Sequence, residues 1–90
     1  MTQTKVLLEN DRVKIVEVRL QPGEKLDMHS HGAYVAYIMN LAKVRFAFPD
    51  GTSREAEFEK GRANFSEGIT HSVENIGTTE VWNLDIELKK

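Results

Sequence analysis

A period of two runs through most of this chain, and it constrains the fold more than any other feature. In RVKIVEVRL (12 to 20), Val16, Val18 and Leu20 fall on one face. VWNLDIEL (81 to 88) alternates more completely, with large apolar residues on one side and mostly polar residues on the other. Successive side chains of a strand point to opposite faces, so both segments are predicted to be strands with one side toward a core.

Turn signals divide the remaining alternation into short pieces. KVRFAF (43 to 48) leads into Pro49-Asp50-Gly51, and the Asp-Gly pair is a strong hairpin signal before TSREAEF (52 to 58). REAEFEKGR (54 to 62) contains good helix formers, but the turn needs a partner strand, so a strand is predicted there. Short strands with glycine turns and no helical stripe predict an all-β domain, a small barrel or sandwich.

The composition bounds the class of protein. The 90 residues suit one domain, predicted to span 1–90 with a barrel core over about 5–88. The chain is 40% hydrophobic and 29% charged, which is typical of a folded protein. With no cysteine, it has no disulfides and no thiolate ligands, so any metal must be held by nitrogen and oxygen.

The same totals predict partners and location. A formal charge of -2 and the lack of a basic cluster argue against a nucleic-acid partner. No signal peptide and no apolar stretch of bilayer length is evident, so a cytoplasmic protein with no membrane partner is expected. A domain this small, without disulfides, often completes its apolar burial by self-association, which predicts a homodimer.

The stretch DMHSHGAY (27 to 34) holds two of the three histidines, His29 and His31, and the third is His71. In a strand, residues i and i+2 share a face with Cα atoms about 6.5 Å apart, so both imidazoles can reach one metal ion. The alternative is a pair of histidines in a turn or on the surface.

The spacing of these histidines and the nearby glycines resembles the two motifs of the cupin family. The first motif is a glycine, five residues, His-x-His, three or four residues, a glutamate, six residues and a glycine. The second is a glycine, five residues, Pro-x-Gly, two residues, a histidine, three residues and an asparagine. The matching residues, with one residue fewer after the second motif's first glycine, are Gly23, His29, His31, Gly61, Gly68, His71 and Asn75.

The resemblance covers residues 13 to 88 and implies a six- to eight-stranded antiparallel jelly-roll barrel with a metal inside one end. It places all three histidines on the family's histidine-ligand positions. Three neutral imidazoles leave coordination positions open on a divalent ion of Fe, Zn, Mn, Co or Ni. A divalent transition metal is therefore the expected cofactor.

The chain also departs from the family's motifs. The glutamate ligand is absent from residues 34 to 36, and Leu41 or a neighbour replaces the closing glycine. Ser66 stands in place of the proline, which leaves Gly68 to supply the unusual backbone angle of that turn.

Two residues are expected to support the metal ligands. Asp27 lies two residues before His29 and is predicted on the same face, as a hydrogen-bond partner for an imidazole or an occasional oxygen ligand. The alternative for Asp27 is a solvated carboxylate. Asn75, the last residue of the second motif, is assigned the same supporting role by the resemblance.

The pocket wall is less determined. One of two alternating sets of residues faces inward, depending on where the chain bends. The two sets are Tyr34, Ala36 and Ile38, and Val35, Tyr37 and Met39. Tyr34 occupies the place of the missing glutamate and is predicted to be catalytic, hydrogen-bonding a metal-bound ligand or acting as an acid, with a plain wall residue as the alternative. The predicted substrate-binding wall consists of Tyr37, Met39, Phe46, Phe48, Phe65 and Trp82.

These observations lead to a functional hypothesis with open alternatives. The first is a metal-dependent enzyme with dioxygenase-like chemistry on a small organic acid or thiol, as three-histidine cupins include thiol and diketone dioxygenases. The alternatives are a metal-assisted isomerase or lyase of a small carboxylated or sugar-derived compound, and a non-catalytic metal- or ligand-binding module. HGAYV, HSVEN and LDIELK are also similar to short cupins grouped with a beta-alanine degradation protein.

Overall fold

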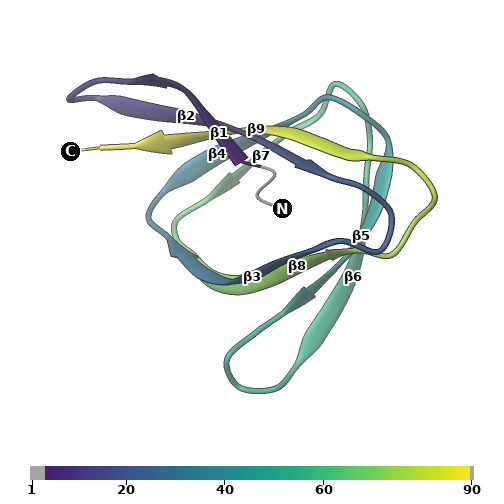
Figure 1. Ribbon diagram of the computed structural model, residues 1–90. Helices are drawn as coiled ribbons and strands as arrows, with labels where there is room; N and C mark the ends of the chain where they lie inside the picture. The colour runs from purple at the N-terminus through teal and green to yellow at the C-terminus, as the bar shows by residue number, and fades with distance from the viewer. Residues whose placement is uncertain (1–3, 90) are drawn as a thin grey trace.

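The computed structural model describes residues 4–89, apart from the side chain of His31. Strands account for all the regular structure in these residues (Figure 1). No helix in this part of the chain is long and apolar enough to cross a membrane. The strands are β1 (Thr4–Glu9), β2 (Val13–Leu20), β3 (Lys25–His31), β4 (Tyr34–Ile38), β5 (Ala42–Ala47), β6 (Ser53–Phe58), β7 (Ala63–Ser66), β8 (Ile69–Asn75) and β9 (Val81–Leu88).

The strands form two antiparallel sheets that face each other (Figure 1). One sheet has the order β1-β2-β9-β4-β7 and the other β3-β8-β5-β6. This confirms the predicted all-β jelly-roll class. The nine strands exceed the six to eight implied by the resemblance. No strand ladder within residues 4–89 joins the two sheets, so the barrel is a sandwich with open edges.

The predicted strands and hairpin are confirmed. β2 and β9 pair along their whole lengths, from Val13 opposite Leu88 to Leu20 opposite Val81. β5 and β6 form the hairpin, and Gly51 in its turn has a φ of 88°, a left-handed conformation that favours glycine. The helix considered for this segment is therefore excluded, because β6 completes the ladder that the turn begins.

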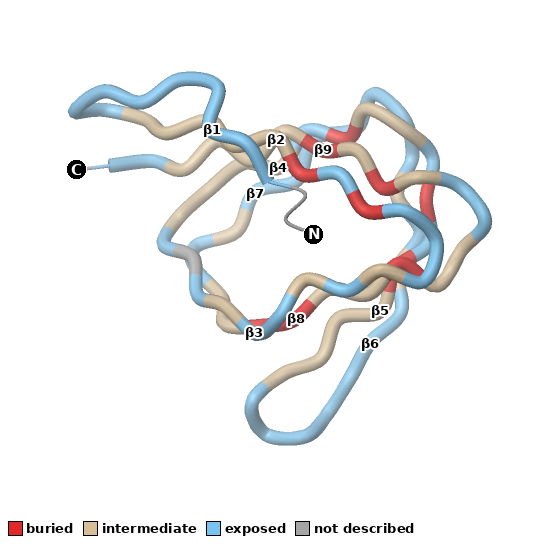
Figure 2. The backbone as a smooth tube through the Cα atoms, in the orientation of Figure 1, coloured by how far each residue is buried: buried red, intermediate tan, exposed pale blue. Residues whose placement is uncertain are grey.

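The core lies where β2, β9, β5 and β8 meet (Figure 2). Alternate side chains of each strand point between the sheets, and the apolar ones collect at this end. The fully or nearly buried apolar residues are Val18, Leu20, Ile38, Ala42, Val44 and Val81.

Asn75 ties this end together. It is 1% exposed, and its Nδ2 donates to the carbonyls of Leu20 at 2.9 Å and Thr79 at 2.8 Å. Its Oδ1 accepts from the N–H of Gly77 at 3.0 Å. A buried amide with these bonds offsets its desolvation cost, so Asn75 stabilises the closed end of the sandwich.

The outer faces of both sheets carry ion pairs, and that of the five-stranded sheet also carries an apolar row. The four-stranded sheet presents ion pairs, in which Arg45 contacts Glu55 at 3.2 Å and Glu74 at 3.3 Å. Directly paired residues of a ladder lie on the same side of a sheet, and in the five-stranded sheet one such row is entirely apolar. This outer stripe consists of Leu8, Ile15, Ile86, Val35 and Phe65.

Candidate metal centre

The pairing of β3 with β8 brings two of the three histidines together. His29 lies directly opposite His71 in this ladder. Their ring centroids are 4.9 Å apart, and the rings are inclined by 70°. Two imidazoles from distant parts of the chain therefore face one volume, an arrangement in which both can reach a common ion.

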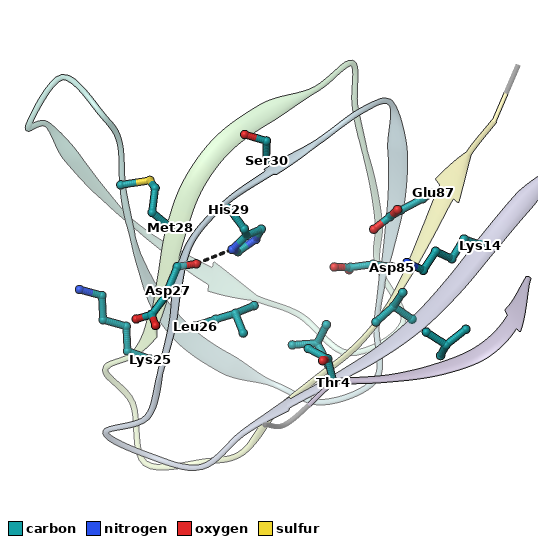
Figure 3. Close-up of a pocket in the computed structure, with 13 residues that line it drawn as sticks. Thr4, Lys14, Lys25, Leu26, Asp27, Met28, His29, Ser30, Asp85 and Glu87 are labelled. Carbon is teal, nitrogen blue, oxygen red and sulfur yellow. Dashed lines mark hydrogen bonds between the residues drawn. The ribbon is translucent and has the colours of Figure 1, made fainter. Parts of the chain in front are cut away.

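A β-bulge in β3 orients the first imidazole. The register with β8 shifts between Leu26 and His29, so extra chain lies between two residues that both line the interior. The bulge brings the carbonyl oxygen of Asp27 to 2.6 Å from Nδ1 of His29 (Figure 3). A carbonyl can only accept, so Nδ1 is the donor, and in the neutral ring Nε2 keeps the lone pair that a metal needs.

Because of the bulge, the carboxylate of Asp27 does not lie beside His29 as predicted. Simple alternation places its carboxylate beside His29, but the extra residue changes the parity, and the Asp27 residue is exposed. Its backbone carbonyl, rather than its carboxylate, contacts the imidazole.

Packing fixes the second imidazole. His71 is 4% exposed, and its ring stacks on Phe46 with centroids 5.1 Å apart and an interplanar angle of 2°. Phe46 is thus part of the wall around the histidines, where it was predicted. A ring held on one side by an aromatic face has little freedom to turn, so its nitrogens are presented in fixed directions.

The third histidine is placed only through its backbone. His31 pairs with Ile69 at the end of β3, two residues beyond His29. Its side chain lies outside the described part of the structure. Among the side chains that are described, no group of three His, Cys, Asp or Glu residues is close enough to hold a metal. His29 and His71 provide two imidazole donors of the kind that a borderline metal such as zinc or iron accepts.

The histidines border a small chamber between the sheets, with a volume of about 50 Å³. It meets two wider hollows at the edges, of about 720 and 480 Å³. His29 and Asp85 line the chamber and the larger hollow (Figure 3), whereas His71, Tyr34 and Phe46 line the chamber and the smaller one. A small molecule can therefore approach the imidazoles from either side.

Polar residues of β9 form the wall opposite the histidines. The side of β9 that faces the interior carries Asn83, Asp85 and Glu87, in the centre of the five-stranded sheet. In the ladders, Asn83 lies between Val18 and Ile38. The sequence showed two faces of this strand, one apolar and one mostly polar, and the polar face is the one turned inward.

Trp82, predicted in the pocket wall, therefore lies on the opposite face of β9. Its indole Nε1 donates to Glu17 at 2.7 Å, and the guanidinium of Arg19 lies 4.4 Å from its ring centroid. This cation–π contact and the hydrogen bond satisfy the indole outside the chamber.

The other predicted wall residues are also divided by strand parity. Tyr34, Ala36 and Ile38 are the inward set of β4, so Tyr37, which is 39% exposed, and Met39 do not line the chamber. Phe48 lies beyond the end of β5 and lines none of these hollows. Phe65 is 60% exposed at the rim of the smaller hollow.

The position of Asn75 also differs from the supporting place beside the imidazoles that was predicted for it. It lies four residues beyond His71 on β8, about 13 Å along the strand, and its amide is engaged at the closed end. It stabilises the sandwich rather than supporting an imidazole.

Two acidic side chains in the interior, the carboxyl of Asp85 and the phenol of Tyr34, have raised pKa values. Burial, reinforced by the nearby charge of Glu87, raises the pKa of Asp85 from 3.8 to about 7. Burial also raises the pKa of Tyr34, and the charge of Asp85 adds to the effect. Asp85 can thus exchange a proton near neutral pH, a property suited to acid–base chemistry. Sequence alternation alone did not reveal this residue, although an acidic residue in an otherwise regular strand was a signal.

Comparisons with known proteins place the chain in a family. No family model matches the sequence, and no curated protein matches it. A cupin domain from Bordetella pertussis Tohama I has a similar solved structure, with 31% sequence identity and a TM-score of 0.89, covering 97% of this chain and 92% of that chain. The chain belongs to the cupin superfamily.

Other solved cupins share the fold at lower identity. A cupin superfamily protein from Desulfitobacterium hafniense DCB-2 is 17% identical, with a TM-score of 0.71, covering 97% of this chain and 76% of that chain. A predicted oxalate decarboxylase from Thermotoga maritima is 23% identical, with a TM-score of 0.69, covering 97% and 79%. Both share the fold over nearly all of this chain.

The raised pKa of Asp85 has a consequence for stability. Below about pH 4 both the folded and the unfolded chain carry the proton; between about pH 4 and 7 the unfolded chain loses it while the folded chain keeps it. The free energy of unfolding therefore falls as pH rises through this window, by roughly 4 kcal/mol at most for this group. We expect Asp85→Asn to match the wild type near pH 4 and to exceed its stability at pH 8, measured by urea unfolding with chelator present.

The exposed residue Asp11 provides the control, since Asp11→Asn should follow the pH profile of the wild type. Parallel profiles for Asp85→Asn and the wild type would show that Asp85 ionises normally in the folded chain.

Proposed function

We propose that this cupin is a metal-dependent enzyme that holds one divalent transition-metal ion with His29, His31 and His71 and acts on a small organic acid. The observation that supports this most is the 4.9 Å approach of the His29 and His71 rings at the chamber. The bond from Nδ1 of His29 to a backbone carbonyl supports it further, because it makes Nδ1 the donor, so that in the neutral ring Nε2 carries the lone pair.

The bound ion would supply a Lewis acid that polarises an oxygen of the substrate. Iron, zinc, manganese, cobalt and nickel all accept imidazole ligands, so each is compatible with this donor set. The chain contributes a narrow chamber with apolar walls at Phe46 and Phe58, which limits the size of the substrate.

Two reaction classes are compatible with such a site. Dioxygenase-like chemistry on an organic acid or thiol is the first, and it requires only open positions on the metal. A metal-assisted lyase or isomerase is the second, and Asp85 favours it, because a carboxyl with a pKa of about 7 can give or take the proton. Turnover under nitrogen separates the two, because only the lyase or isomerase proceeds without oxygen.

Proteins of similar fold support a small organic acid as the substrate. Two of the similar structures carry the name oxalate decarboxylase, one of them only predicted to be so, at 23% and 24% identity. That name describes a lyase whose substrate is a small dicarboxylate. A non-catalytic metal- or ligand-binding module remains the alternative, and it would bind the ion without any turnover.

Metal content tests the proposal directly. Protein purified without chelator or nickel resin should contain about one metal ion per chain by elemental analysis. His71→Gln removes one imidazole from the set, so we expect its metal content to fall at least tenfold, together with the melting temperature. Thr70→Val, on the opposite face of β8 where Thr70 contacts Ser30, should keep the metal of the wild type.

Wild-type levels of metal in His71→Gln would contradict the proposed ligand set. A metal-free wild type, purified as described, would contradict the proposed function altogether.

We also propose that the chain forms a homodimer through the outer stripe. The stripe leaves apolar side chains of all five strands at the surface, and Phe65 is 60% exposed. An apolar face can pack against the same face of a second copy about a two-fold axis, so a second copy can cover the stripe. The ion pairs of Arg19 with Glu17 and Glu80 lie on the same face beside the stripe, and those of Arg45 lie on the outer face of the other sheet.

Light scattering on a sizing column should give twice the chain mass of 10.2 kDa for the wild type. Leu8→Lys with Phe65→Lys adds charge to two exposed positions of the stripe, so we expect a folded monomer. Glu55→Lys on the charged face should stay dimeric. A monomeric wild type, or a dimer unaffected by the double substitution, would contradict this interface.

A further inference from the structure

Asn83 is a buried amide whose bonding the fold does not complete. The residue is 8% exposed, and its Oδ1 has no hydrogen-bond partner among the described residues. It lines the chamber and lies between Val18 and Ile38 in the ladders, so its nearest strand neighbours are apolar. Buried polar atoms are nearly always paired, and an orphan acceptor at a cavity wall marks a place for a donor from a bound molecule.

Asp85 continues the same wall toward the larger hollow. It lies two residues beyond Asn83 on the inward face of β9 and borders both the chamber and that hollow. In Figure 3 its carboxyl group points into the space that His29 faces. Near neutral pH, part of the population keeps the carboxyl protonated and able to donate a hydrogen bond.

Tyr34 adds a second hydroxyl to this wall. It pairs with Glu87 in the β4–β9 ladder, which makes it a diagonal neighbour of Asp85 on the same face. Its side chain lines the chamber from the smaller hollow. The wall thus contains an acceptor at Asn83 and hydroxyl donors at Tyr34 and Asp85.

We propose that Asn83, Asp85 and Tyr34 form the substrate-binding wall of the chamber and select a small 2-hydroxy carboxylate. The substrate hydroxyl donates to Oδ1 of Asn83, and the carboxylate accepts from the hydroxyl groups of Tyr34 and Asp85. This wall faces the histidines, so the inference deepens the proposed function and rests on it for the position of the metal. The hydrogen bonds themselves do not require the ion.

The chemistry of the chamber favours a hydroxyl over an ammonium group as the donor. An ammonium would bring a positive charge beside the proposed divalent ion, and like charges in a cavity of low dielectric repel strongly. The volume of about 50 Å³ holds little more than one water molecule's share of the liquid, so only the hydroxyl end enters it. The carboxylate lies at the mouth of the chamber, which Tyr34 and Asp85 both line.

Glycolate and acetate form a matched pair of probes, because they differ only in the hydroxyl. We expect the wild type to bind glycolate about tenfold more tightly than acetate, the effect of one hydrogen bond to a buried acceptor that otherwise has none. The dissociation constants are measured by amide chemical-shift titration, once on protein loaded with Zn²⁺ and once on protein treated with chelator.

Asn83→Leu replaces the amide by an apolar side chain of similar size. We expect the glycolate preference to fall to about one, while the melting temperature stays the same or rises by a few degrees, because a buried unpaired acceptor is removed. A purely structural asparagine would lower the melting temperature instead. Asn64→Leu, at an exposed position on β7 that lines the smaller hollow but not the chamber, should keep the tenfold preference.

Equal binding of glycolate and acetate by the wild type would overturn the inference, as would an undiminished preference in Asn83→Leu. Preference for glycolate in the chelator-treated protein, with no Zn²⁺ bound in the loaded sample, would support this binding wall and reject the proposed metal site.

Discussion

The pairing of β3 with β8 is the constraint on which the site depends. This ladder places His29 opposite His71, and the bulge before His29 supplies the carbonyl that orients its ring. Phe46 then holds His71 by stacking. Backbone geometry therefore positions one imidazole, and packing positions the other.

Along β9, in the centre of the five-stranded sheet, polar side chains face the interior and apolar side chains face outward. Its interior side carries Asn83, Asp85 and Glu87, while Trp82, Leu84 and Ile86 lie on the outer side. Burying a carboxyl and an amide that lacks a partner lowers stability, and a sequence optimised for stability alone would place the apolar side inward. The polar interior is consistent with a cavity built for a ligand, and the apolar exterior with a face that another copy covers.

Much of the fold could be predicted from local patterns. The β2 and β9 strands follow from alternation, and the β5–β6 hairpin from Asp50-Gly51, because strand periodicity and turn chemistry act within a few residues. The spacing of the histidines and glycines was enough to indicate the cupin superfamily. Gly68 adopts a φ of 142°, as expected where Ser66 replaces the proline of the motif.

The details of the site could not be predicted in the same way. Alternation separates two faces of a strand without showing which one is inside, so Trp82 was placed in the pocket and Asp85 was overlooked. The bulge that turns the Asp27 side chain outward has no signal in DMHSH, because it depends on the register with β8. Asn75 matches the motif, but its bonds to Leu20 and Thr79 exist only once three distant segments meet.

The proposed site requires imidazoles from β3 and β8 to bind one ion. X-ray absorption at the zinc edge, on protein loaded with one equivalent of Zn²⁺, counts the imidazoles around the metal and gives their distances. We predict three imidazole nitrogens at about 2.0 to 2.1 Å in the wild type, and two around the zinc that His71→Gln still binds. A wild-type spectrum with one imidazole or none, or a spectrum that His71→Gln leaves unchanged, would contradict it.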